Sequence, residues 1–234
     1  MKPNIRRLAA FLPLFLTTSA NAAIAINLPG NTETAGWQEL GTSFAGNTWT
    51  ADGFPTAFPL ADNPWPSDIA PNAPGSTSSA TFGKSSGGGY FASTSIYNAG
   101  SPGTHFLTNA SPIAGISTLV VQFDLGSPLA DAPVFTYNGG TAGPAPEFAL
   151  TAAGKFTSGF TGEPAPTTIH AWQWDLSDIP DPITDWNLDF STAPHGTIYE
   201  MRLDSGDTFA QVIPEPGTAA IASLAILTLL RRRR

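Results

Sequence analysis

Apolar and polar residues alternate with a period of two along much of the second half of the chain. In residues 119–125, Leu119 and Phe123 occupy one set of alternate positions, whereas Gln122 and Asp124 occupy the other. Because successive side chains of a strand point to opposite faces, this pattern predicts a strand with one face in the core and the other in water.

The same alternation recurs in three later stretches, separated by residues that favour turns. The apolar members are Trp172, Trp174 and Leu176, then Trp186, Leu188 and Phe190, and then Tyr199, Met201 and Leu203. The turn sequences are Asn138-Gly139-Gly140, Pro180-Asp181-Pro182 and Pro194-His195-Gly196. Short strands with such turns between them, and no sustained helical period, predict an all-β fold, an antiparallel β-sandwich of the jelly-roll type.

The first residues have the pattern of a secretory signal peptide. A positively charged start precedes the apolar run from Leu8 to Leu16, and Ala20 and Ala22 form the small-x-small site, which predicts cleavage before Ala23. Residues 1–22 are therefore assigned to the signal peptide, and signal peptidase is an expected partner.

A second targeting pattern begins at residue 212. Pro214, Glu215 and Pro216 precede an apolar stretch, residues 218–230, which predicts a helix of about 20 Å at 1.5 Å per residue, short of a bilayer core of about 30 Å. The four residues after it are all basic: Arg231, Arg232, Arg233 and Arg234. Arginines resist translocation, so they are expected to stop transfer and to stay on the cytoplasmic side.

Pro-Glu-Pro, an apolar helix and an arginine cluster in this order resemble the PEP-CTERM sorting signal. The resemblance covers residues 212–234 and the signal peptide, and it does not extend to residues 23–211. It implies export in a bacterium with an outer membrane, a transient inner-membrane anchor, and processing near Glu215 by an exosortase-type transpeptidase. Proteins with this signal commonly accompany exopolysaccharide, which makes exopolysaccharide an expected partner.

Residues 23–211 are interpreted as one β-sandwich domain. The proline-rich residues 53–77 favour extended loop, which we interpret as an excursion from this sandwich rather than a linker between two small domains. With 41% hydrophobic and only 12% charged residues the chain can form a core, which excludes a disordered protein. It has no Cys and therefore no disulfide.

Charge excludes nucleic acid as a partner. The basic residues lie mainly at the two ends, and only Lys84, Lys155 and Arg202 lie between them, against many acidic residues. Such a body would repel a phosphate backbone.

Tryptophans and aspartates are the candidates for binding. Trp37, Trp49 and Trp65 lie in loop-rich sequence and are candidate glycan contacts, with core packing as the alternative. The later tryptophans, Trp172, Trp174 and Trp186, fit the core face. The Asp-rich stretch that holds Asp175, Asp178 and Asp181 offers oxygen ligands for calcium, although these residues are also turn formers. No cofactor is otherwise expected.

Three histidines, His105, His170 and His195, show neither metal-ligand spacing nor a hydrolase motif, and we expect structural roles for them. The sequence as a whole predicts a non-enzymatic protein of the cell surface or extracellular matrix. A glycan-binding module is the first alternative. An extracellular hydrolase acting on polysaccharide is the second, and it would need two close carboxylates beside a cleft.

Overall fold

The structure is a computed structural model. It describes residues 26–38, 40, 69–91, 95–98, 100–127, 129, 131–157 and 164–213. The signal peptide, most of the proline-rich excursion and the sorting signal from Pro214 onward lie outside these residues.

The described residues form strands and connecting loops, and no helix occurs among them. The strands are β1 (Thr32–Trp37), β2 (Thr81–Gly87), β3 (Tyr90–Phe91), β4 (Ile96–Tyr97), β5 (Gly103–Asn109), β6 (Thr118–Leu125), β7 (Val134–Tyr137), β8 (Thr141–Ala142), β9 (Phe148–Thr157), β10 (Pro164–Asp175), β11 (Trp186–Thr192) and β12 (Thr197–Gly206). The prediction of an all-β fold is confirmed.

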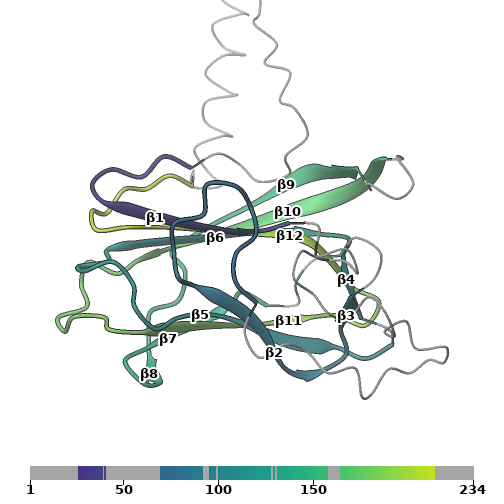
Figure 1. Cartoon of the computed structure of the whole chain (residues 1–234), viewed down its shortest axis with the longest axis horizontal. Coiled ribbons are helices and arrows are strands. Elements are labelled where there is room, and N and C mark those ends of the chain that lie inside the picture. Colours follow the sequence, from purple (N-terminus) through teal and green to yellow (C-terminus); the bar gives the residue numbers. More distant parts are fainter. Residues whose placement is uncertain are drawn as a thin grey trace, which may run out of the picture.

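Two antiparallel sheets form the two layers seen in Figure 1. The larger sheet has seven strands in the order β3-β4-β12-β6-β10-β9, and β1 pairs with β12 beside that path. The smaller sheet has five strands in the order β2-β5-β11-β7-β8. Strands that are neighbours in a sheet are often distant in sequence. For example, β12 pairs with both β1 and β6.

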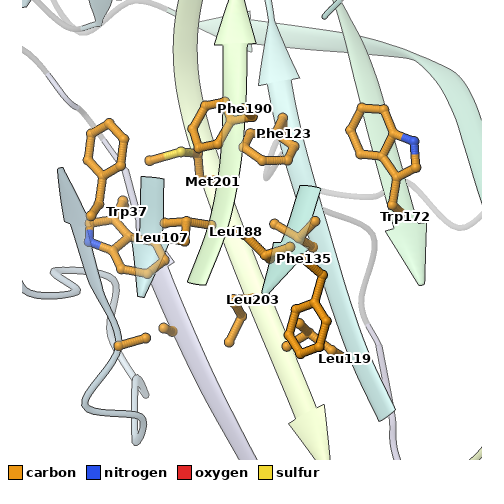
Figure 2. Close-up of a cluster of buried hydrophobic side chains, with 14 of the residues drawn as sticks. Trp37, Leu107, Leu119, Phe123, Phe135, Trp172, Leu188, Phe190, Met201 and Leu203 are labelled. Atoms are coloured by element: carbon orange, nitrogen blue, oxygen red, sulfur yellow. The ribbon is translucent and has the colours of Figure 1, made fainter. Parts of the chain in front are cut away.

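The core lies between the sheets and is rich in aromatic rings (Figure 2). Phe123 of β6 and Phe190 of β11 face each other across the layers, with ring centroids 4.6 Å apart. Trp174 and Trp186 are fully buried, and Trp172 is nearly so. The predicted core positions of these tryptophans are therefore confirmed, as is the core face of β6.

The other face of β6 contradicts the sequence-based expectation, because it is buried rather than in water. Gln122 is 1% exposed and Asp124 is 3% exposed. A small second core forms on this outer face, in which Val120 and Ala171 pack against Ile213. Residues 207–213, which follow β12, thus lie on the outer face of the larger sheet. We call them the strap.

The pattern of β12 also differs from the prediction. A β-bulge shifts the register between Ile198 and Glu200. Ile198, rather than Tyr199, occupies the core position, and Tyr199 is only partly buried. A bulge adds one unpaired residue to its strand, so simple alternation fails at that point.

Turn chemistry explains the sharp connections. Asn138 has a φ of 48° between β7 and β8, and His195 has a φ of 61° between β11 and β12. Both turns were predicted from their sequences. Asn and His occur in this left-handed region more often than most residues do, and glycine follows each of them in the chain.

Candidate functional site

An acidic pocket on the outer face of the larger sheet is the candidate site. Asp124 of β6 lies directly opposite Glu200 of β12 in the strand register. Directly opposed residues of antiparallel strands have Cβ atoms about 5 Å apart. The bulge at Tyr199 sets this register, so it brings the two carboxylates into one pair.

Asp124 is buried without hydrogen-bond partners. Neither of its carboxylate oxygens has one, and the hydroxyl of the buried Thr167 on β10 also has none. Both groups lie against Gly154 of β9. A methyl group at position 154 would approach Thr167 Oγ1 to 2.5 Å and Asp124 Oδ1 to 3.2 Å. Glycine at this position therefore leaves space beside two unsatisfied polar groups.

Burial controls the acid–base behaviour of the pocket. Removal from water raises the pKa of Asp124, and the proximity of Thr167 opposes this only in part. The pKa of Tyr199 is raised by burial and, to a smaller degree, by the negative charge of Asp124.

A nearby arginine serves another carboxylate. Arg202 Nε and Nη2 donate to the two carboxylate oxygens of Asp204, at 2.8 and 2.9 Å. Arg202 also lines the pocket that holds Asp124, but its two printed hydrogen bonds go to Asp204.

The cavity at this pocket is small. It has a volume of about 10 Å³. The residues that line it are Gln122, Phe123, Asp124, Ile169, Glu200, Met201 and Arg202. A space of this size holds about one water molecule or one small ion. It has no room for a sugar ring.

The strap forms a second built feature on the same face, and Gln173 of β10 holds it. The Gln173 side chain donates to Ala210 O at 2.6 Å and accepts from the backbone N–H groups of Val212 and Ile213, each at 3.0 Å. Gln173 is fully buried, and its amide has both donor and acceptor partners. Thr118 adds a second attachment by donating to Thr208 O at 3.1 Å.

The three histidines take separate places. His105 is fully buried between Phe82 and Phe190, and burial, aided by the charge of Lys84, lowers its pKa to about 3. His170 stacks on Trp172 and contacts Thr151 Oγ1 at 3.3 Å, and burial lowers its pKa. His195 Nδ1 lies 2.7 Å from the hydroxyl of Tyr97.

The structure places one of the candidate glycan contacts in the core. Trp37 is fully buried on β1, and its indole N–H donates to Ile69 O at 2.9 Å. It cannot stack on a sugar from that position, so the packing alternative holds for it. Trp49 and Trp65 lie outside the described residues.

The candidate calcium ligands do not assemble. In the ranges that the structure describes, which include Asp175, Asp178 and Asp181, no three His, Asp or Glu side chains converge into a group able to hold a metal. Asp175 instead accepts hydrogen bonds from the backbone and hydroxyl of Ser177. The structure therefore does not bring these three side chains together, and calcium binding there stays a prediction.

The targeting residues lie outside the described ranges. These are Ala20, Ala22 and Ala23, then Pro214, Glu215 and Pro216, and then Arg231 to Arg234. Among the residues that are described, no helix is long and apolar enough to cross a bilayer. No family model, curated protein or solved structure matches this chain.

Sequence reasoning missed both features of the outer face, although a signal for them was present. Val120 lies between Leu119 and Val121, so three consecutive apolar residues interrupt the alternation of β6. Such a run is typical of a strand that is buried on both faces. Val212 and Ile213, two apolar residues beyond the last strand, were available to cover it.

Proposed function

We propose that the chain is a non-enzymatic, jelly-roll-like surface or matrix protein that is exported by its signal peptide and processed through its PEP-CTERM-like tail. The observation that carries this proposal is the order of the three tail features, Pro214-Glu215-Pro216, the apolar residues 218–230 and the arginine cluster. Each feature has a physical use: an extended protease-accessible segment, a membrane helix and a stop to translocation.

The position of the strap supports this reading. Ile213 is 2% exposed and packs against Val120 and Ala171, and it directly precedes Pro214. The folded body thus extends up to the motif. Processing beyond Ile213 would release a complete body with both of its hydrophobic cores intact.

The chemistry of the described residues favours a role without catalysis. The one acid pair discussed above opens on a cavity of about 10 Å³. Four of the six tryptophans, Trp37, Trp172, Trp174 and Trp186, pack in the core and offer no platform for a sugar. An acidic sandwich carried to the surface is then best understood as a component of a cell-surface or exopolysaccharide matrix.

Intact-mass analysis tests the proposal directly. The full chain is produced in an outer-membrane bacterium that carries an exosortase-type enzyme, and the secreted protein is analysed. We expect the mass of a chain that begins at Ala23 and lacks Arg231 to Arg234. Replacement of Pro214, Glu215 and Pro216 by Ala should leave the protein unprocessed in the membrane fraction.

The chain provides its own control motif. Pro180-Asp181-Pro182 has the same Pro-acid-Pro order in an exposed loop of the body, so its replacement by Ala should leave processing unchanged. Secreted protein that still carries Arg231 to Arg234, or equal processing of both triple variants, would contradict the proposal.

A further inference from the structure

We infer that Gln173 is a positioning residue that fixes where the processed body ends. Gln173 holds the strap on the outer face of the larger sheet, and the docked strap prevents an enzyme from cutting the chain before Pro214. This inference rests on the proposed processing of the tail. It adds that the folded body, and not the Pro-Glu-Pro motif alone, sets the limit of that processing.

Hydrogen bonds attach the strap to the body from its first residue to its last. Asp207 donates its backbone N–H to Asn31 O at 3.1 Å, and its carboxylate accepts two hydrogen bonds from Asn31, at 2.6 and 3.0 Å. Ala210 donates its N–H to Thr118 Oγ1 at 3.2 Å. The three hydrogen bonds of Gln173 then extend the attachment to the end of the strap.

Apolar burial fixes the last residue of the strap. Ile213 is 2% exposed and lies in the second core with Val120 and Ala171. Ile26, near the predicted start of the mature chain, packs against the same core. The two ends of the described body therefore meet on the outer face, and the side chain that directly precedes Pro214 is covered.

A protease needs the opposite arrangement. An enzyme that binds a peptide as an extended strand uses the backbone N–H and C=O groups of the peptide together with its side chains. In the strap, the N–H groups of Val212 and Ile213 are both bonded to Gln173 Oε1. Bonds before Pro214 therefore become substrates only when the strap detaches, so the rate of cutting there follows the population of the detached form.

The sequence beyond the strap defines the other limit. Four residues, Pro214 to Gly217, separate Ile213 from the apolar stretch that begins at Thr218. Four residues span at most about 14 Å. An enzyme that acts between the body and the membrane thus has one limit of cleavage at Ile213 and the other at Thr218.

Limited proteolysis of the full chain measures the limit at Ile213. The chain is produced in a host without an exosortase-type enzyme, purified in detergent and treated with proteinase K, a protease of broad specificity. Mass spectrometry then identifies the C-terminal residue of the fragment that contains β12. We expect this fragment to end at Ile213 or beyond. In Gln173→Ala, cuts within residues 208–213 should form at least roughly tenfold faster, because the strap loses three hydrogen bonds.

Gln211→Ala is the matched control, because Gln211 is an exposed glutamine of the same strap. Its fragment should end where the fragment of the parent chain ends. Ile213→Ser removes the apolar contact from a residue that lies outside both sheets, so it carries the test if Gln173→Ala does not fold. In both strap variants the new cuts should leave β10 and β12 intact, which separates detachment of the strap from general unfolding.

Expression of the parent and Gln173→Ala with an exosortase-type enzyme tests the limit during export. The secreted parent should end within residues 214–217, and Gln173→Ala should add shorter products that end within the strap. A parent chain that keeps its tail contradicts the proposed function. This inference is overturned if proteinase K cuts the parent within residues 208–213, if Gln173→Ala and Ile213→Ser give the fragment of the parent, or if Gln211→Ala alone shifts the end. Identical ends for the two secreted chains would also overturn it.

Discussion

The two faces of the larger sheet are both buried, but by different means. The inner face presents Phe123 and Trp174 to the opposite sheet, and the contacts there are apolar. The outer face carries Asp124, Gln122 and Gln173 at exposures of 3% or less. It is covered in part by the strap, a segment of backbone rather than a second sheet.

This difference shows that burial and apolar composition are separate properties. A sheet layer brings only side chains to the interface, whereas an irregular strap brings backbone N–H and C=O groups that need partners. Gln173 supplies those partners, and its polarity is therefore a requirement of the packing. Asp124 lies on the same face, and its carboxylate oxygens make no such contacts with the strap.

Disruption of the inner face should have the largest effect. Phe123→Ala removes a ring that packs 4.6 Å from Phe190 and 5.7 Å from Trp172, and should lower the free energy of unfolding by about 3–5 kcal/mol. Denaturant unfolding measures the loss. Val134→Ala is the control at 61% exposure and should change stability by less than about 0.5 kcal/mol. Similar losses in both variants would mean that the inner face is not the dominant core.

Disruption of the strap should have the next largest effect. Gln173→Ala removes three hydrogen bonds and should destabilise the docked strap by about 2–3 kcal/mol. Hydrogen exchange should show faster exchange of the amides of Val212 and Ile213. Gln211→Ala, an exposed glutamine of the strap itself, should leave that exchange nearly unchanged. Unaltered protection in Gln173→Ala would show that apolar packing alone holds the strap.

His105 provides a pH-dependent comparison with both faces. Its pKa of about 3 in the folded protein lies below the ordinary value of 6.5, so the unfolded chain takes up a proton first as the pH falls. The contribution of neutral, buried His105 to the free energy of unfolding is complete above pH 6.5. It is lost between pH 6.5 and about 3, at about 1.4 kcal/mol per pH unit.

The variant His105→Gln isolates that effect. Asp124 acts in the opposite sense, because its raised pKa means that the folded protein keeps the proton of Asp124 to a higher pH than the unfolded chain does. The useful quantity is therefore the difference in unfolding free energy between the parent chain and the variant at each pH. The free energy of unfolding, measured from neutral to acid pH, should fall less steeply in His105→Gln than in the parent chain. The difference in slope should correspond to the uptake of about one proton on unfolding. Parallel curves for the two chains would rule out His105 as the source of the acid sensitivity.

The Arg202–Asp204 ion pair should have the smallest effect. The Arg202 side chain is 33% exposed, and solvent screens such pairs strongly. A double-mutant cycle with Arg202→Met and Asp204→Asn should give a coupling energy below about 1 kcal/mol, which decreases in high salt. A coupling that exceeds the effect of Gln173→Ala would show that charge, rather than the strap, dominates the outer face.

Local pattern was sufficient to predict the inner face. Alternation placed Leu119, Phe123, Trp174 and Leu188 toward the core, and glycine, proline and asparagine marked the turns. These features depend on neighbours within a few residues, so a single sequence carries them.

Features made by distant contacts were beyond such a pattern. Trp37 is buried in the core, and the acceptor for its indole N–H is Ile69 O, which is 32 positions away. The bulge at Tyr199 changes which residues of β12 reach the core, and nothing in the local alternation marks it. The acidic pocket needs β6, β9, β10 and β12 together, so Asp124 had the sequence signature of a solvated residue.

The attachment of the strap also has a mechanical consequence. If the chain is pulled from beyond Ile213, as by a tether, the load first reaches the contacts of Gln173 and Thr118 and only afterwards the ladder of β12. The hydrogen bonds of Gln173 and Thr118 to the strap would then break and re-form under load while the two sheets stay folded.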